Sequence, residues 1–79
     1  MNLKCIYCNW IGLFSDFEID HIFPLSRGGS DSPQNRRLIC SGCNREKGDK
    51  THSEYLSWRL IAGLAGVRLN FGPIKGGGV

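Results

Sequence analysis

Long apolar segments are missing from this chain of 79 residues. Its longest apolar stretch, residues 60–67, has eight residues and includes two glycines, whereas a membrane-spanning helix needs roughly 18 apolar residues. Residues 1–5 also lack the apolar core of a secretory signal peptide. We therefore expect a cytoplasmic protein without a membrane partner.

The chain also has little room for a hydrophobic core. Below roughly 80 residues such a core seldom contributes more than a few kcal/mol, so a further stabilising link is expected. Hydrophobic residues make up 41% of the sequence and charged residues 22%, which is ordinary for a globular protein and excludes a chain that is disordered as a whole. The sequence therefore predicts one small domain that is stabilised by a cross-link in addition to its core.

Four cysteines in two Cys-x-x-Cys pairs are the candidates for that link. Cys5 and Cys8 form one pair, Cys40 and Cys43 form the other, and 31 residues separate the pairs. Disulfides need an oxidising compartment, and a thioredoxin-like redox site uses one such pair rather than two. Two pairs can complete a tetrahedral site of four thiolates. We therefore predict a structural zinc ion whose binding is coupled to folding.

The net charge of +3 is unevenly distributed along the sequence. Residues 1–26 sum to −2, residues 27–50 to +3 and residues 51–79 to +2. A mildly basic chain is weak evidence for a nucleic-acid partner, and the alternative is a solvated basic surface. The basic side chains of the middle segment that are candidates for contacting phosphates are Arg27, Arg36, Arg37, Arg45 and Lys47.

The middle of the chain alternates between patterns of strand, loop and helix. We expect these elements in the order strand 17–22, loop 26–33, strand 37–40 and helix 44–47. The first strand ends before Pro24, because proline cannot continue a strand ladder. The second strand is expected to run antiparallel to the first. The short helix is expected to end at Gly48.

A second helix is predicted from Thr51 or Ser53 onward. Thr51 and Glu54 have the spacing of a capping box. Apolar residues recur on one face of this helix, which predicts packing against the zinc-bound half, and the alternative is a surface for a protein partner or a homodimer. This face comprises Tyr55, Leu56, Trp58, Leu60, Ile61 and Leu64. Residues 72–79 are predicted to form a flexible tail.

Three side chains in this segment have the chemistry needed to hydrolyse a phosphodiester. His21 suits the role of general base, because the ordinary pKa of imidazole lies near neutral pH. Asp20 and Asn44 offer hard oxygen ligands for Mg²⁺ or Mn²⁺, an ion that the cysteine site does not suit. Adjacent strand residues point to opposite faces, so the strand must twist or bulge near residues 23–24 if Asp20 and His21 are to flank one phosphate.

Simpler interpretations of these residues are also open. Asp20 can pair with Arg27 or Arg37 as a strand-end carboxylate. Asn44 can cap the short helix instead of binding a metal. The second histidine, His52, is expected to be exposed at the start of the second helix.

A longer motif surrounds these residues. It comprises residues 20–31 (DHIFPLSRGGSD), Asn35, Leu38, Cys40 and residues 43–48 (CNREKG). With the first cysteine pair, it resembles the HNH endonuclease family over residues 5–50. The resemblance implies a ββα-metal finger, here in a four-cysteine zinc variant. It further implies metal-dependent hydrolysis of DNA to 5′-phosphate and 3′-hydroxyl ends.

The resemblance also implies roles for particular residues. His21, Asn35 and Asn44 correspond to the catalytic set, a His-Asn-Asn form in which Asn44 stands where the family name implies a histidine. Asn35 is expected to act indirectly, by orienting the loop that faces the base. The five basic residues named above are expected to contact phosphates that flank the cut, which gives affinity without sequence specificity.

We therefore predict a small α+β protein in which residues 1–50 form a zinc-bound nuclease finger. Residues 51–79 add a C-terminal helix and tail to the same domain. The predicted function is a DNA endonuclease with structural Zn²⁺ and catalytic Mg²⁺ or Mn²⁺, of bacterial or phage origin, as in restriction or DNA packaging. The alternative is a zinc finger that binds nucleic acid or protein without turnover inside a larger assembly.

Overall fold

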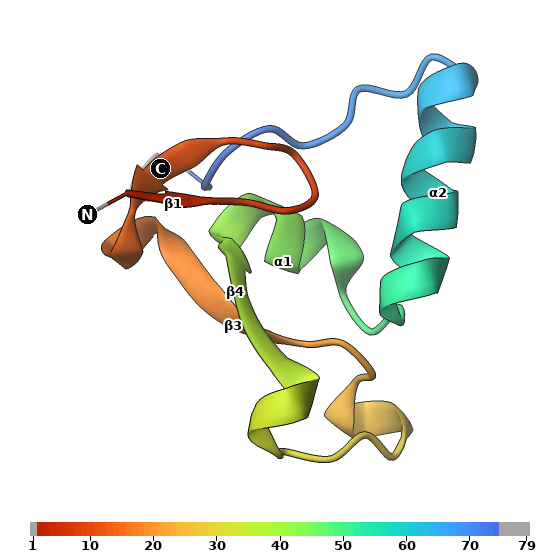
Figure 1. Cartoon of the computed structure of the whole chain (residues 1–79). Helices are drawn as coiled ribbons and strands as arrows, with labels where there is room; N and C mark the ends of the chain where they lie inside the picture. The colour runs from red at the N-terminus through yellow and green to blue at the C-terminus, as the bar shows by residue number, and fades with distance from the viewer. Residues whose placement is uncertain (1, 75–79) are drawn as a thin grey trace.

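The computed structural model describes residues 2–74, which form two antiparallel hairpins and two helices (Figure 1). Short 3₁₀ turns lie between some of these elements. The strands and helices are β1 (Asn2–Lys4), β2 (Ile11–Leu13), β3 (Phe17–His21), β4 (Arg36–Cys40), α1 (Ser41–Lys47) and α2 (His52–Leu64). No helix within residues 2–74 is long and apolar enough to cross a membrane. The arrangement confirms the predicted α+β class, with β3, β4 and α1 as the ββα unit.

The β3–β4 hairpin is the framework of this unit. Its antiparallel ladder runs from the Phe17–Cys40 pair to the His21–Arg36 pair. β3 ends at His21, close before Pro24, which has no N–H to donate to a ladder. Both predicted strands are confirmed, with β4 starting one residue before its predicted start.

α1 begins three residues before the predicted helix. Cys40 is its N-cap, because the Cys40 Sγ accepts a hydrogen bond from the Cys43 N–H at 3.4 Å. Capping side chains are usually Ser, Thr, Asp or Asn, so the sequence pattern did not indicate this start. The helix ends at Gly48 as predicted, where φ is 57°, a left-handed value that glycine adopts without strain.

A small core of aromatic and sulfur-containing side chains joins the hairpins to α2. Tyr55 of α2 is fully buried and packs edge-on against Tyr7, with ring centroids 4.6 Å apart. The predicted capping box is present, since Thr51 and Glu54 exchange hydrogen bonds between side chains and backbone N–H groups. The buried core residues are Cys5, Tyr7, Cys8, Phe17, Ile39, Cys40, Cys43 and Tyr55.

The prediction that the leucine stripe of α2 packs in the core is wrong. Leu60 is 66% exposed and Leu64 is 81% exposed. The buried residues of α2 are Tyr55 and Ala62, which lie seven residues apart and therefore share one face of the helix. The predicted packing is confirmed for Tyr55, and Trp58 is partly buried against the core. Figure 1 shows α2 standing beside the finger, so only one of its sides meets the rest of the chain. A role of the leucine face in binding a partner or a second copy stays a prediction.

The segment after α2 returns to the end of the molecule where the first hairpin lies (Figure 1). The Gly72 N–H donates to the Cys8 Sγ at 3.4 Å, and the Ile74 N–H donates to the Ser41 Oγ at 2.9 Å. The prediction of a flexible tail is therefore wrong for residues 72–74, whose backbone is held by these bonds. Residues 75–79 of the predicted tail lie outside the described residues.

The two faces of α2 should differ sharply in their contribution to stability. Tyr55→Ala removes a fully buried ring, a change that costs about 3–5 kcal/mol. Leu60→Ala, the matched control on the same helix, removes exposed surface and should change the free energy of unfolding by less than about 0.5 kcal/mol. Urea unfolding of the zinc-loaded proteins measures both values. Equal losses would contradict the exposed placement of the leucine face.

Candidate active site and zinc site

The four cysteines meet at one end of the molecule. Cys5 and Cys8 lie between β1 and β2, Cys40 ends β4 and Cys43 lies in α1. All four are buried, and their Sγ atoms lie within 4.8 Å of one another. Thiolates about 2.3 Å from a tetrahedral zinc ion lie about 3.8 Å apart, and the Sγ atoms of Cys8 and Cys40 are 3.7 Å apart. The donor set therefore fits a structural zinc ion.

Residues outside the cysteine pairs support this cluster. Asn70 Nδ2 donates to the Cys43 Sγ at 3.3 Å, a type of contact that stabilises zinc-bound thiolates. The Glu46 carboxylate holds Asn70 in turn, because it accepts bonds from the Asn70 N–H at 3.0 Å and the Tyr55 hydroxyl at 2.6 Å. A hydrogen bond from Cys43 lowers the pKa of the Cys5 thiol to about 4. Sequence motifs gave no sign of Asn70 or Glu46, since neither has a metal-ligand spacing.

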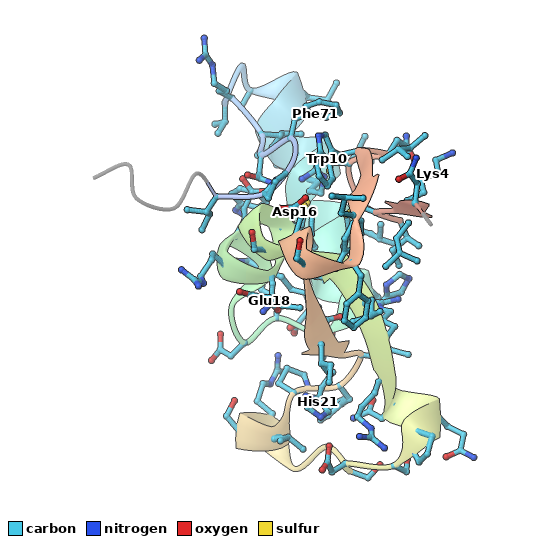
Figure 2. All side chains as sticks on the ribbon, turned by 90° about the vertical axis from the view of Figure 1, so that its left-hand side faces the viewer. Lys4, Trp10, Asp16, Glu18, His21 and Phe71 are labelled. Atoms are coloured by element: carbon cyan, nitrogen blue, oxygen red, sulfur yellow. The ribbon has the colours of Figure 1, made fainter. Side chains whose placement is uncertain are left out.

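A pocket of about 190 Å³ lies where the end of β3 meets α1. Asp20, His21 and Asn44 all line it, so the structure brings the three predicted residues together. Figure 2 shows His21 at the end of β3, next to the turns that follow. The ladder between Phe17 and His21 is regular, and the pocket receives both neighbours because it wraps around the strand end. The remaining lining residues are Ile19, Pro24, Leu25, Ser26, Lys47, Gly48 and Asp49.

Asp20 is held between two basic side chains, with 3% of its own side chain exposed. Its Oδ1 lies 2.9 Å from the Lys47 Nζ, and its Oδ2 accepts a bond from the Arg37 Nε at 3.1 Å. The simpler interpretation of Asp20, a pair with Arg37, is therefore correct, and Lys47 is an additional partner. An ionised carboxylate has about four lone-pair sites. Asp20 thus keeps acceptor capacity for a cation in the pocket.

Asn44 lies inside α1 and does not cap it, because Cys40 is the N-cap. The capping interpretation of Asn44 is therefore wrong. Its Nδ2 donates to the Glu18 Oε1 at 2.8 Å, which fixes the orientation of the amide. Within residues 2–74 no hydrogen bond is made to the Asn44 Oδ1. This oxygen is therefore available to a hard cation in the pocket.

The His21 ring is held from the loop that precedes β4. Its Nε2 lies 2.8 Å from the Asp31 Oδ1. Asn35 shapes the same loop, because its Oδ1 accepts a bond from the Phe23 N–H at 2.9 Å and its Nδ2 donates to the Ser30 carbonyl at 2.6 Å. These bonds are those of a loop-orienting residue. The catalytic roles of His21 and Asn35 stay predictions.

The predicted phosphate contacts lie in two different environments. Arg37 and Lys47 face Asp20 inside the molecule, and Lys47 is only 1% exposed. The positive charges of these two side chains balance a buried carboxylate. Contact with DNA stays a prediction for the three with exposed side chains, Arg27, Arg36 and Arg45.

His52 is partly buried, so the expectation of an exposed side chain is wrong. Its Nδ1 lies 2.8 Å from the Tyr7 hydroxyl and 2.9 Å from the Arg37 guanidinium. Burial and the charge of Arg37 lower the pKa of His52, which favours a neutral imidazole. His52 therefore links α2 to the ion pair around Asp20, and it does not line the pocket.

Comparison with known proteins identifies the family. The family model described as HNH endonuclease matches residues 5–50. The CRISPR-associated endonuclease Cas9 of Corynebacterium diphtheriae is 31% identical over 67 residues, which are 84% of this chain and 6% of that protein. The chain belongs to the HNH endonuclease family. It spans only 6% of the length of this curated relative.

Loss of one sulfur should unfold the zinc-bound end of the molecule. Cys40→Ser removes a zinc ligand and the N-cap of α1 together. We expect the zinc content to fall severalfold and the helical circular dichroism to decrease, because metal binding and folding are coupled. Ser41→Ala, at the neighbouring position, is the matched control and should retain both. Full zinc content with a native spectrum in Cys40→Ser would contradict the four-cysteine site.

Lys47 and Arg45 lie two positions apart in α1 and should differ in their effect on stability. Lys47→Ala leaves the buried Asp20 carboxylate with one cation fewer, and breaking a buried pair costs about 3–5 kcal/mol. Arg45→Ala breaks an exposed pair with Glu18, which should cost less than about 1 kcal/mol. Urea unfolding of the two variants provides the comparison. Losses below 1 kcal/mol for both would argue against a buried Lys47–Asp20 pair.

Proposed function

We propose that the chain is a metal-dependent endonuclease that hydrolyses phosphodiester bonds of DNA. The observation that carries this proposal is that Asp20, His21 and Asn44 line one pocket. Membership of the HNH endonuclease family supports the reaction class. The relative is named as a CRISPR-associated endonuclease, although this chain matches only a small part of it.

Three exposed arginines neighbour residues of the pocket, and each lies within ion-pair distance of an acidic side chain: Arg27 of Glu54, Arg36 of Asp31 and Arg45 of Glu18. Arg27 follows the pocket residue Ser26, and Arg45 follows the pocket residue Asn44. Arg36 lies opposite His21 in the β3–β4 ladder. These three arginines would bind phosphates on either side of the cut and position the backbone of the nucleic acid. Contacts of this kind read no bases, so we expect weakly specific cleavage.

Asp20 and Asn44 would hold a divalent cation, Mg²⁺ or Mn²⁺, through one carboxylate and one amide oxygen. So few protein ligands leave coordination positions for water and phosphate. When bound, such an ion stabilises the charge that develops on the phosphate and on the leaving 3′ oxygen. Lys47 holds Asp20 oriented within the pocket, with its Nζ 2.9 Å from the Asp20 Oδ1. The cysteine site is closed by four sulfur ligands, so zinc there would be structural.

His21 would act as the general base. A neutral imidazole whose one nitrogen donates to Asp31 has a lone pair on the other nitrogen. That nitrogen would take a proton from the attacking water as the water oxygen bonds to phosphorus. The bond between phosphorus and the 3′ oxygen then breaks, and that oxygen takes a proton from solvent water, which leaves 5′-phosphate and 3′-hydroxyl ends. One pocket cuts one strand, so the expected product is a nick.

Relaxation of a supercoiled plasmid tests this function. Zinc-loaded protein is incubated with Mg²⁺, with Mn²⁺ or without a further divalent ion. We expect nicking only when one of these ions is added. His21→Ala should nick at least about 100-fold more slowly, because it removes the base from the site. Zinc content and circular dichroism should stay unchanged, since His21 is not part of the buried core.

The second histidine provides the matched control. His52→Gln changes an imidazole outside the pocket and should retain most of the nicking rate at a temperature where the variant is folded. Wild-type nicking by His21→Ala would contradict the role of the base. No cleavage by folded, zinc-loaded wild type with either ion would favour the alternative of a binding module without turnover. A place in restriction or in phage DNA packaging stays a prediction.

A further inference from the structure

The partner of His21 is a charged residue in the loop that precedes β4. The Asp31 Oδ1 lies 2.8 Å from the His21 Nε2. This hydrogen bond lowers the pKa of the Asp31 carboxyl below its usual range, so the group is ionised near neutral pH. An ionised carboxylate can only accept hydrogen bonds. Nε2 must therefore donate, and a neutral ring with its proton on Nε2 has its lone pair on Nδ1.

We propose that Asp31 is a positioning residue for His21. Its carboxylate holds the ring in the tautomer with the proton on Nε2, and so presents the Nδ1 lone pair to the attacking water. Once Nδ1 has taken the proton, the same carboxylate stabilises the imidazolium from 2.8 Å. The inference rests on the proposed nuclease function, and it assigns the proton-accepting atom and the residue that selects it.

Asn35 holds Asp31 in place. Both neighbours of Asp31 are bonded to Asn35, because its Nδ2 donates to the Ser30 carbonyl at 2.6 Å and its N–H donates to the Ser32 carbonyl at 2.9 Å. The same amide binds both the N–H and the carbonyl of Phe23, two residues after the base, at 2.9 Å. One side chain therefore fixes the loop segments that carry the base and its partner, as expected of a preorganised site.

Removing the charge of Asp31 distinguishes a positioning role from a merely structural one. Its side chain is 69% exposed and lies 3.9 Å from the Arg36 guanidinium. An exposed carboxylate beside bound DNA repels phosphate, so its removal should strengthen DNA binding or leave it unchanged. Loss of positioning would instead slow the chemical step. Loss of the repulsion would therefore lower KM or leave it unchanged, whereas loss of positioning would lower kcat.

Single-turnover and steady-state nicking of Asp31→Ala and Asp31→Asn measure these effects. We expect Asp31→Ala to lower kcat by about tenfold or more, the effect typical of removing a residue that orients a functional histidine, with KM unchanged or lower. Asp31→Asn keeps an acceptor oxygen without the charge and should recover part of kcat. A wild-type kcat in Asp31→Ala, or a change confined to KM, would overturn the proposal. Zinc content verifies that each variant is folded.

Nitrogen NMR of the imidazole rings tests the same proposal without DNA. The chain has two histidines, so His52→Gln assigns the His21 signals. At pH 8 we expect the Nε2-protonated tautomer of His21 in the wild type and a mixture of tautomers in Asp31→Ala. The same tautomer distribution in both proteins would overturn the proposal. The expected shift in a wild type that cuts no DNA would support the pairing and contradict the nuclease function alone.

Discussion

Convergence of four cysteines on one site is the constraint on which the rest of the structure depends. Few large side chains are buried outside this cluster and the tyrosines beside it. Cys40 shows the dependence most clearly, because it is one of the four clustered cysteines, the last residue of β4 and the N-cap of α1. It pairs with Phe17 at one end of the hairpin, and His21 lies at the other end. The metal site thus fixes where the pocket lies between the strand and α1.

A second constraint is the buried carboxylate of Asp20. Lys47 reaches it from α1 and also donates to the His21 carbonyl at 2.9 Å. Arg37 reaches it from β4 and connects it to His52 of α2. A buried carboxylate is stable only with such partners. The same two cations hold the proposed metal ligand in place before any substrate arrives.

The two long strands and the capping box were predictable, because each follows from a spacing or a periodicity within a short segment. The cysteine cluster was predictable from two matching Cys-x-x-Cys spacings. The three pocket residues were selected through the resemblance to the HNH motif and not through local geometry. The packed face of α2 was not predictable in this way. Leucines at four-residue intervals outlined the centre of the predicted face, yet the residues of α2 that are buried are Tyr55, at the edge of that face, and Ala62 outside it. The Lys47–Asp20 pair joins residues 27 positions apart, and no local pattern indicates such a pair.

The central claim is that one pocket holds both the base and the ligands of a divalent cation. Paramagnetic broadening by Mn²⁺ tests it directly, in zinc-loaded His21→Ala bound to a DNA duplex. The account predicts that the amide signals of residues 19–21 and 44–48 broaden at the lowest Mn²⁺ concentration, and that Asp20→Asn in the same background abolishes the effect. Broadening centred elsewhere, or unchanged broadening in the Asp20→Asn variant, would contradict it.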